Sequence, residues 1–444
     1  MISLPPGLVD RYSLPSPRYT SYPTVMHWGA APAESAWLKS LDTTLGTAAA
    51  HCAIYVHVPF CQSLCTFCGC NMRLARNHAL AAPYVDTLLQ EFALYRQRLA
   101  APQLTLGELH LGGGSPTWLP AGELDRMLDG ILQNCTLAPQ ADLAIEVDPR
   151  NTTREQLQVL RRHGFKRLSL GVQDFDARVL EIVNRAQSEA EVRQLVDDAR
   201  ELGFTSLSFD LIFGLPLQTT DSLRTTLDIA EQLRPDRIAF LPYAHVPWIK
   251  QSQRRYTDAD LPEPVLRQQL FALGREHLGG TGFVEIGMDQ YARRNDALAQ
   301  ALAGGRLHRN FMGFSATPTQ ALIGLGVSAI GDSRSTYAQN EKNLQQYEAR
   351  VQAQALPLQR GHVLTATDLA IRPLLWNLLT RSRTALSTTD KAATWWPQTH
   401  RALQALQQDG LVTLQDDAIE VTELGRAQLR HIGTAFDQYL RPGH

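Results

Sequence analysis

Short apolar runs alternate with amphipathic segments through the middle of the chain. The runs are apolar almost throughout rather than at every second position, which is typical of parallel strands covered by helices on both faces. They predict strands at Ala53–Val58, Glu108–Leu111, Leu143–Val147, Arg167–Val172, Leu207–Phe213 and Ile238–Pro242. The segments between them predict helices at Pro83–Leu99, Gly122–Asn134, Arg154–His163, Glu189–Leu202 and Leu223–Leu233.

Six strand–helix repeats predict a parallel, barrel-like α/β domain, because right-handed crossovers leave few other topologies. In such a barrel the functional side chains gather at the carboxyl ends of the strands. The segments after the predicted strands are indeed glycine-rich or polar. They contain Gly112-Gly113-Gly114-Ser115-Pro116-Thr117, Glu146, Asp148, Gln173, Asp174, Asp210, Tyr243 and His245.

The two ends of the chain lie outside these repeats. Residues 1–50 predict an N-terminal arm over the active site, residues 51–360 the barrel with an extension, and residues 361–444 a mainly α-helical domain. The C-terminal pattern is typical of a winged-helix-like module. It predicts helices at Asp368–Leu379 and His400–Gln408, a hairpin of Leu411–Leu414 with Ile419–Thr422, and a last helix at Leu424–Leu440.

Charge and composition limit the possible partners. Winged helices often bind DNA, but Asp416 and Asp417 at the predicted hairpin would repel phosphate, so we expect a lid or a substrate-docking role. Hydrophobic residues make up 44% of the 444 residues, charged residues 19%, and the net charge is −2. This balance favours no nucleic acid and no membrane surface as partner. No run reaches the roughly 20 apolar residues of a membrane helix, and the first residues lack a signal-peptide pattern, so we expect a cytoplasmic protein.

Three cysteines carry the most specific chemistry in the chain. Cys61, Cys65 and Cys68 stand in HVPFCQSLCTFCGC with the spacing C-x3-C-x2-C. Such a loop gives an iron–sulfur cubane three thiolates and leaves a fourth iron open, whereas electron-transfer ferredoxins close all four positions with cysteine. The loop resembles that of the radical S-adenosylmethionine (SAM) enzymes, in which SAM caps the open iron. A structural zinc site that adds Cys70 as fourth ligand is the alternative.

Several further segments resemble one radical SAM family, the oxygen-independent coproporphyrinogen III oxidases. The likeness extends over nearly the whole chain. It implies a partial (β/α)6 barrel of the radical SAM type. The segments are PRYTSYPT (Pro17–Thr24), YVHVPFCQSLCTFCGC (Tyr55–Cys70), GGGSPT (Gly112–Thr117), LHRNFMGF (Leu307–Phe314) and GLGVSAIGD (Gly324–Asp332).

The resemblance implies roles for individual residues. Cys61, Cys65 and Cys68 would hold one 4Fe–4S cluster, and Tyr55, His57 and Cys70 would take part in catalysis. The family binds two SAM molecules. The first would contact Tyr55, Gly113, Glu146 and Ile330, and the second Phe67, Gly114, Ser115, Gln173, Arg185, Asp210 and Ala244.

The implied reaction is the decarboxylation of two propionate side chains of coproporphyrinogen III to vinyl groups, which gives protoporphyrinogen IX in haem synthesis. Arg18, His57, His308 and Arg309 are candidates for binding the propionates by charge-assisted hydrogen bonds. For His57, a competing role beside Tyr55 in packing the cluster loop has equal weight. A flavodoxin or ferredoxin would supply electrons, and we expect a monomer. A haem chaperone of the same fold and a radical SAM methyltransferase are the alternative functions.

Overall fold

The computed structural model describes residues 6–12, 16–47, 50–100 and 103–441, so parts of the predicted N-terminal arm lie outside the described residues. The chain forms two compact units. The barrel unit comprises Ala30–Thr281 and Thr317–His362. The composite unit is assembled from three segments, Met1–Gly29, Gly282–Ala316 and Val363–His444. The three domains inferred from the sequence, residues 1–50, 51–360 and 361–444, stay a prediction, because the two units divide the chain by spatial contact and not by order along the sequence.

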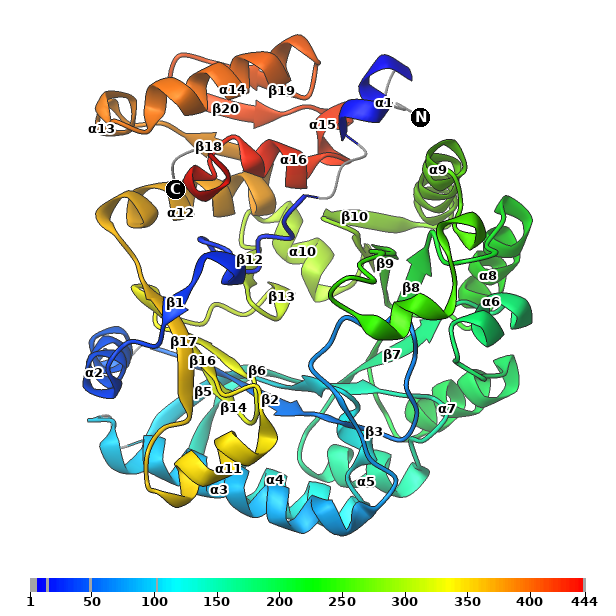
Figure 1. Ribbon diagram of the computed structural model, residues 1–444, viewed down its shortest axis with the longest axis vertical. Helices are drawn as coiled ribbons and strands as arrows, with labels where there is room; N and C mark the ends of the chain where they lie inside the picture. Colours follow the sequence, from blue (N-terminus) through cyan, green and yellow to red (C-terminus); the bar gives the residue numbers. More distant parts are fainter. Residues whose placement is uncertain (1–5, 13–15, 48–49, 101–102, 442–444) are drawn as a thin grey trace. The chain divides into compact units, whose positions relative to one another are not determined.

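The barrel unit contains the six predicted parallel strands as adjacent members of one sheet, in the order β2-β5-β6-β7-β8-β9. The predicted partial parallel (β/α)6 barrel is therefore confirmed. Figure 1 shows the helices outside this curved row of strands. The strands are β2 (Cys52–Val58), β5 (Leu104–Gly113), β6 (Cys135–Val147), β7 (Arg167–Gln173), β8 (Ser206–Phe213) and β9 (Arg237–Pro242).

The predicted helices are present, and the sequence explains where three of them begin. Thr153, Ser188 and Thr219 each accept a hydrogen bond from the backbone N–H three residues on, and the residue at that position returns one, which forms a capping box. The helices of this unit are α2 (Glu34–Leu45), α3 (Ala81–Arg98), α4 (Ala121–Leu132), α5 (Arg154–Arg162), α6 (Ala177–Ile182), α7 (Glu189–Glu201), α8 (Thr220–Gln232), α9 (Pro264–Gly280) and α11 (Leu344–Gln352).

Later residues extend the barrel sheet beyond β2. Strand β14 (Ala321–Leu325) pairs with β2 in parallel, and β15 (Ile330–Asp332) and β16 (Thr336–Asn340) follow as antiparallel neighbours. Strand β17 (Leu358–Val363) lies beside β16. The remaining short elements of the barrel unit are β3 (Phe60–Cys61), β4 (Arg73–Leu74) and the 3-10 helices η2 (His78–Leu80), η3 (Pro116–Trp118), η4 (Gln251–Arg255) and η5 (Asp258–Asp260). The 3-10 helix η1 (Val25–His27) belongs to the composite unit, and β1 (Gly29–Ala30) stands at the boundary between the two segments.

The composite unit has its own core, to which all three of its segments contribute. Tyr19 and Tyr22 come from the first segment, Met288 from the second, and Leu375 and Phe436 from the third. Its elements are α1 (Pro6–Tyr12), β10 (Phe283–Gly287), β11 (Gln290–Arg293), α10 (Ala297–Ala303), β12 (His308–Asn310), β13 (Gly313–Ser315), α12 (Ala366–Arg381), β18 (Arg383–Ala385), α13 (Thr388–Ala392), α14 (Trp396–Gln408), β19 (Val412–Leu414), β20 (Ala418–Val421), α15 (Glu423–Arg426), α16 (Leu429–Thr434) and η6 (Gln438–Leu440).

The single last helix predicted at Leu424–Leu440 is wrong. The segment is broken into α15, α16 and η6. Within α15, close packing requires glycine at position 425, because a Cβ on Gly425 would lie 2.0 Å from the carbonyl oxygen of Leu411. The apolar spacing of the segment carried no sign of this tertiary contact.

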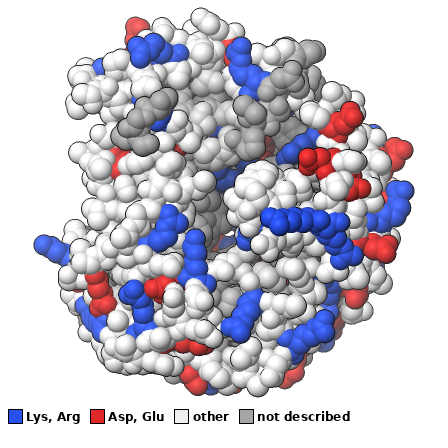
Figure 2. All heavy atoms as spheres, viewed as in Figure 1, with Lys and Arg blue, Asp and Glu red and all other residues white. Residues whose placement is uncertain are grey.

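The visible face of the molecule carries side chains of both charges. Lysine and arginine side chains are interspersed with aspartate and glutamate on the face shown in Figure 2. No helix among the described residues has the length and apolar character needed to cross a membrane.

Candidate active site

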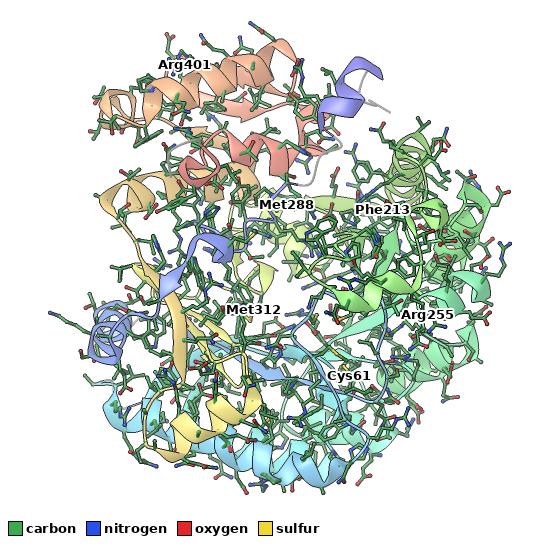
Figure 3. All side chains as sticks on the ribbon, viewed as in Figure 1. Cys61, Phe213, Arg255, Met288, Met312 and Arg401 are labelled. Atoms are coloured by element: carbon green, nitrogen blue, oxygen red, sulfur yellow. The ribbon has the colours of Figure 1, made fainter. Side chains whose placement is uncertain are left out.

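The cysteine loop follows β2, and its two ends are fastened together. Strand β3 pairs in parallel with β4, with Cys61 opposite Leu74. The N–H of Arg73 donates to the carbonyl of Pro59 at 2.7 Å, and the N–H of Ala75 to that of Cys61 at 2.9 Å. Cys61, labelled in Figure 3, therefore begins a loop whose base is fixed by backbone hydrogen bonds.

The glycine run after β5 lies directly against this loop. A Cβ on Gly114 would be 2.6 Å from the carbonyl oxygen of Pro59 and 2.9 Å from the sulfur of Cys61. Gly113 has φ +119°, and its Cβ would lie 2.8 Å from the carbonyl oxygen of Val58. Only glycine permits the two backbones to approach so closely. The run therefore shapes the space beside Cys61.

Tyr55 and His57 form a hydrogen-bonded chain that reaches the far end of the cysteine loop. His57 Nε2 lies 2.8 Å from the carbonyl oxygen of Asn71, so it carries the proton and donates. Its Nδ1 then accepts from the Tyr55 hydroxyl at 3.1 Å. Burial lowers the pKa of His57, which favours this neutral form. Both ring nitrogens are thus engaged, which supports the loop-packing role of His57.

Glu146, near the end of β6, faces the same glycine run. One of its carboxylate oxygens accepts from the Gly113 N–H at 3.3 Å, and the other lies 3.4 Å from His110 Nε2. The His110 ring stacks on that of Tyr55 with centroids 6.1 Å apart. Tyr55, Gly113 and Glu146, which the sequence analysis grouped together, are therefore neighbours.

Two arginines direct N–H groups at the sulfur of Cys65. Arg150 Nη2 lies 3.5 Å from it and Arg185 Nη1 lies 3.4 Å from it. Both guanidiniums also pair with Asp148, Arg150 at 2.6 Å and Arg185 at 3.3 Å. Burial opposes ionisation of Asp148, but these two cations outweigh it and lower the pKa of the carboxyl group. Two guanidinium N–H groups therefore point at the Cys65 sulfur.

Arg185 and Gln173 leave buried polar atoms without a protein partner. Arg185 Nε and Gln173 Oε1 have no hydrogen bond, although both atoms are buried. Both side chains lie over Gly171, where a Cβ would be 3.0 Å from Gln173 Nε2 and 3.3 Å from Arg185 Nη2. Since buried polar groups are normally satisfied, a donor and an acceptor left open side by side indicate a polar ligand.

The segment after β9 holds the cysteine loop from another side. The buried Gln253 donates to the carbonyls of Ala244 and Phe67, at 3.1 Å and 3.4 Å. Lys250 Nζ donates to the carbonyl of Cys70 at 3.0 Å. The loop is therefore fixed by η4 as well as by its own base.

Comparison with known proteins identifies the family. The Escherichia coli protein named oxygen-independent coproporphyrinogen III oxidase is 39% identical over 98% of this chain and 95% of its own length. The Pseudomonas aeruginosa protein of the same name is 36% identical over the same shares.

The chain belongs to the oxygen-independent coproporphyrinogen III oxidase family.

The fold comparison agrees with this membership. A solved structure named coproporphyrinogen III oxidase (HemN) from Escherichia coli, described as a radical SAM enzyme, has a TM-score of 0.91, 38% identity, and covers 99% of this chain and 100% of its own. Residues 55–230 match the radical SAM superfamily. The chain is therefore a radical SAM enzyme, and this class of enzyme uses a 4Fe–4S cluster and SAM.

The residues present fit these cofactors. Cys61, Cys65 and Cys68 are free thiols. No three His, Cys, Asp or Glu side chains in the described part of the chain converge on one metal ion. In an iron–sulfur cluster, by contrast, each cysteine thiolate binds a different iron atom. The glycine beside Cys61, the two cations at Cys65 and the open polar atoms of Arg185 and Gln173 all suit an anionic cluster with a polar ligand.

The other residues implied by the family resemblance have fewer contacts with the cysteine loop and the glycine run. The Ser115 N–H donates to the carbonyl of Phe60 at 3.0 Å, and Asp210 accepts from Ser169 at 3.3 Å. Ile330 begins β15, and Cys70 is exposed at the end of the cysteine loop. Arg18, His308 and Arg309 belong to the composite unit.

Sequence reasoning missed Arg150 and gave no role to Asp148. The sequence did contain an indication of their importance, since Asp148-Pro149-Arg150 directly follows β6. Charged residues at that end of a barrel strand are functional candidates. Gln253 had no comparable signal, because its importance arises from contacts with Phe67 and Ala244 that only the fold creates.

Proposed function

We propose that the protein converts coproporphyrinogen III to protoporphyrinogen IX by oxidative decarboxylation of two propionate side chains. The likeness to the Escherichia coli enzyme of that name over nearly the full length of both chains supports this proposal most strongly. The cysteine loop and the cations around Cys65 are consistent with it.

The same reaction occurs at each of the two propionate side chains. The side chain loses one hydrogen atom from its β-carbon, then carbon dioxide and one electron, which passes to an external one-electron acceptor, and a vinyl group remains. When bound, the reduced cluster and SAM supply the hydrogen-atom acceptor, with methionine and 5′-deoxyadenosine as products. The protein's own residues position the reactants and exclude water from them.

We further propose that two SAM molecules bind. The Gly113 N–H and the Glu146 carboxylate are polar groups suited to the amino acid part of the first molecule. The open atoms of Arg185 and Gln173 are suited to the second. The first set is Tyr55, Gly113, Glu146 and Ile330, and the second is Phe67, Gly114, Ser115, Gln173, Arg185, Asp210 and Ala244.

The proposal includes the cellular setting. A flavodoxin or ferredoxin supplies the electrons, and the protein acts as a cytoplasmic monomer without nucleic acid or membrane as partner. The near balance of charge, with a formal net charge of −2, supports the last two points.

An anaerobic assay tests the function. The reconstituted protein is mixed with SAM, a reductant and coproporphyrinogen III, and porphyrins are followed by chromatography after oxidation. We expect protoporphyrin and 5′-deoxyadenosine to form together, and Cys65→Ser to form neither. SAM cleavage that leaves the propionates intact would contradict the substrate assignment.

A further inference from the structure

Three arginines from different segments gather in the composite unit. Arg18 comes from the first segment, Arg309 from β12 and Arg430 from α16. We call these residues the arginine cluster. Arg430 Nη2 forms an ion pair with Asp289 Oδ2, and Arg18 Nη2 lies 4.0 Å from the same oxygen. Two guanidiniums therefore converge on one carboxylate oxygen.

Asp289 is held in place by an unusual turn between β10 and β11. Gly287 pairs with Gln290, so Met288 and Asp289 form a two-residue loop. Their φ angles are +46° and +75°, in the left-handed region that residues other than glycine rarely adopt. Met288, labelled in Figure 3, is buried in the core of this unit. Such backbone conformations persist where packing enforces them, commonly at binding sites.

Arg309 is fixed by neutral groups rather than by an acid. Its Nε donates to the carbonyl of Tyr19 at 3.1 Å and its Nη2 to that of Arg18 at 2.9 Å. The guanidinium also lies 4.7 Å from the centre of the Phe314 ring. These contacts orient the guanidinium, and no carboxylate among the described residues forms an ion pair with it.

Arg430 also has unused capacity. Its Nε is buried and has no hydrogen-bond partner. Burial and the nearby charge of Arg18 lower the pKa of Arg309 and of Arg430, each to about 9. An additional anion would relieve both effects, since opposite charge stabilises a buried cation.

We propose that the arginine cluster binds carboxylate groups of the tetrapyrrole substrate, in competition with Asp289 for Arg18 and Arg430. This inference rests on the proposed function, because that function supplies a substrate with four propionates. Guanidiniums suit this task because they donate two parallel hydrogen bonds to a carboxylate. It adds Arg430 and Asp289 to the two arginines suggested by the sequence.

Binding of a fluorescent analogue tests the site directly. Coproporphyrin III, the oxidised form of the substrate, is titrated into the full-length protein, and its uncharged tetramethyl ester is titrated in parallel. We expect Arg430→Met to weaken binding of the acid by about 10- to 100-fold, the range for a lost charged hydrogen bond. We expect no change for the ester.

Two further variants sharpen the test. Asp289→Asn removes the competing negative charge, and asparagine tolerates the left-handed backbone, so we expect tighter binding of the acid. Arg426→Met is the matched control, because Arg426 belongs to the same unit and donates to the carbonyl of Glu285 at 2.7 Å. It should bind as wild type does.

The outcomes separate this inference from the proposed function. Equal affinities of Arg430→Met and Arg426→Met for the acid would overturn the site, as would an equal loss with acid and ester. If Arg430→Met does not fold, unchanged or weaker binding by Asp289→Asn overturns it. A wild-type protein that binds coproporphyrin through these residues but does not decarboxylate coproporphyrinogen III would refute the function and support the site.

Discussion

At the scale of single residues, Cys65 differs from the other two cysteines of its loop. Its sulfur accepts from Arg150 at 3.5 Å and from Arg185 at 3.4 Å. Hydrogen bonds and positive charge at a cluster sulfur stabilise the reduced state, which carries one more electron. Arg185 is also a candidate SAM contact, so Arg150 is the cleaner residue with which to test this effect.

We predict that Arg150→Gln lowers the reduction potential of the cluster. The change removes a cation and leaves Asp148 less well compensated, and both effects disfavour the added electron. The measurement is a redox titration of the reconstituted protein followed by electron paramagnetic resonance. Arg154→Gln is the control, because Arg154 pairs with Asp198 and Glu201 in α7. If both variants had the wild-type potential, Arg150 would have no electronic role.

The glycine run provides a second prediction at this scale. Gly114→Ala places a methyl group 2.9 Å from the Cys61 sulfur and 2.6 Å from a backbone carbonyl oxygen, so the loop must shift. We expect iron content after reconstitution to fall well below three-quarters of the wild-type value. Gly122→Ala is the matched control, since its Cβ would meet nothing within 4 Å. Full iron content in Gly114→Ala would show that the close approach is dispensable.

At the scale of elements, helix α3 joins the first barrel strand to the extension. The Tyr84 hydroxyl donates to the carbonyl of His57 at 2.6 Å and accepts from the Val327 N–H at 3.2 Å. Seven residues on, Glu91 accepts from the Gly326 N–H at 2.8 Å and from the Tyr347 hydroxyl at 2.7 Å. One face of α3 thus positions the end of β2, from which the cysteine loop departs.

This network makes stability depend on pH through Glu91. Burial raises the pKa of Glu91 from its ordinary 4.5 to about 7. Between these values the folded protein keeps a proton that the unfolded chain releases, so stability falls as pH rises. We predict that Glu91→Gln, which cannot titrate, gains stability relative to wild type by about 3 kcal/mol from pH 4.5 to 7.

Calorimetry at pH 5 and pH 7.5 checks this prediction. The difference between the melting temperatures of Glu91→Gln and wild type should move in favour of the variant at the higher pH. A constant difference would mean that Glu91 is ionised throughout the range.

The barrel elements were predictable because their signals are local. Apolar runs and capping residues such as Thr153 and Ser188 lie within the segments they define. Strand β6 is an exception, since it begins at Cys135 rather than Leu143, and its largely exposed first half pairs with β5 from Leu104 onward. The contact of Arg150 with Cys65 joins residues 85 positions apart, so no local pattern announced it.

At the scale of the whole molecule, the composite unit shows why sequence segments and folded units differ. Tyr19 donates from its hydroxyl to Asp437 at 3.1 Å, and its ring packs on Gly433, where a Cβ would lie 2.7 Å away. The Tyr22 hydroxyl donates to the carbonyl of Phe436 at 3.3 Å. Tyr19 and Tyr22 are therefore interior residues of this unit, packed against elements of the third segment.

We predict that residues 361–444 expressed alone do not unfold cooperatively. The fragment lacks Tyr19, Tyr22 and Met288, and its apolar core positions would be exposed to water. Near-ultraviolet circular dichroism during heating measures this, and a sharp transition in the fragment would contradict it. A peptide of residues 16–29 added in excess should restore part of the signal, whereas the same peptide with Tyr19→Ala and Tyr22→Ala should not.

In the full chain, Tyr19→Phe removes only the hydroxyl and should cost about 1 kcal/mol, because ring packing, rather than the single hydrogen bond, ties the segments together.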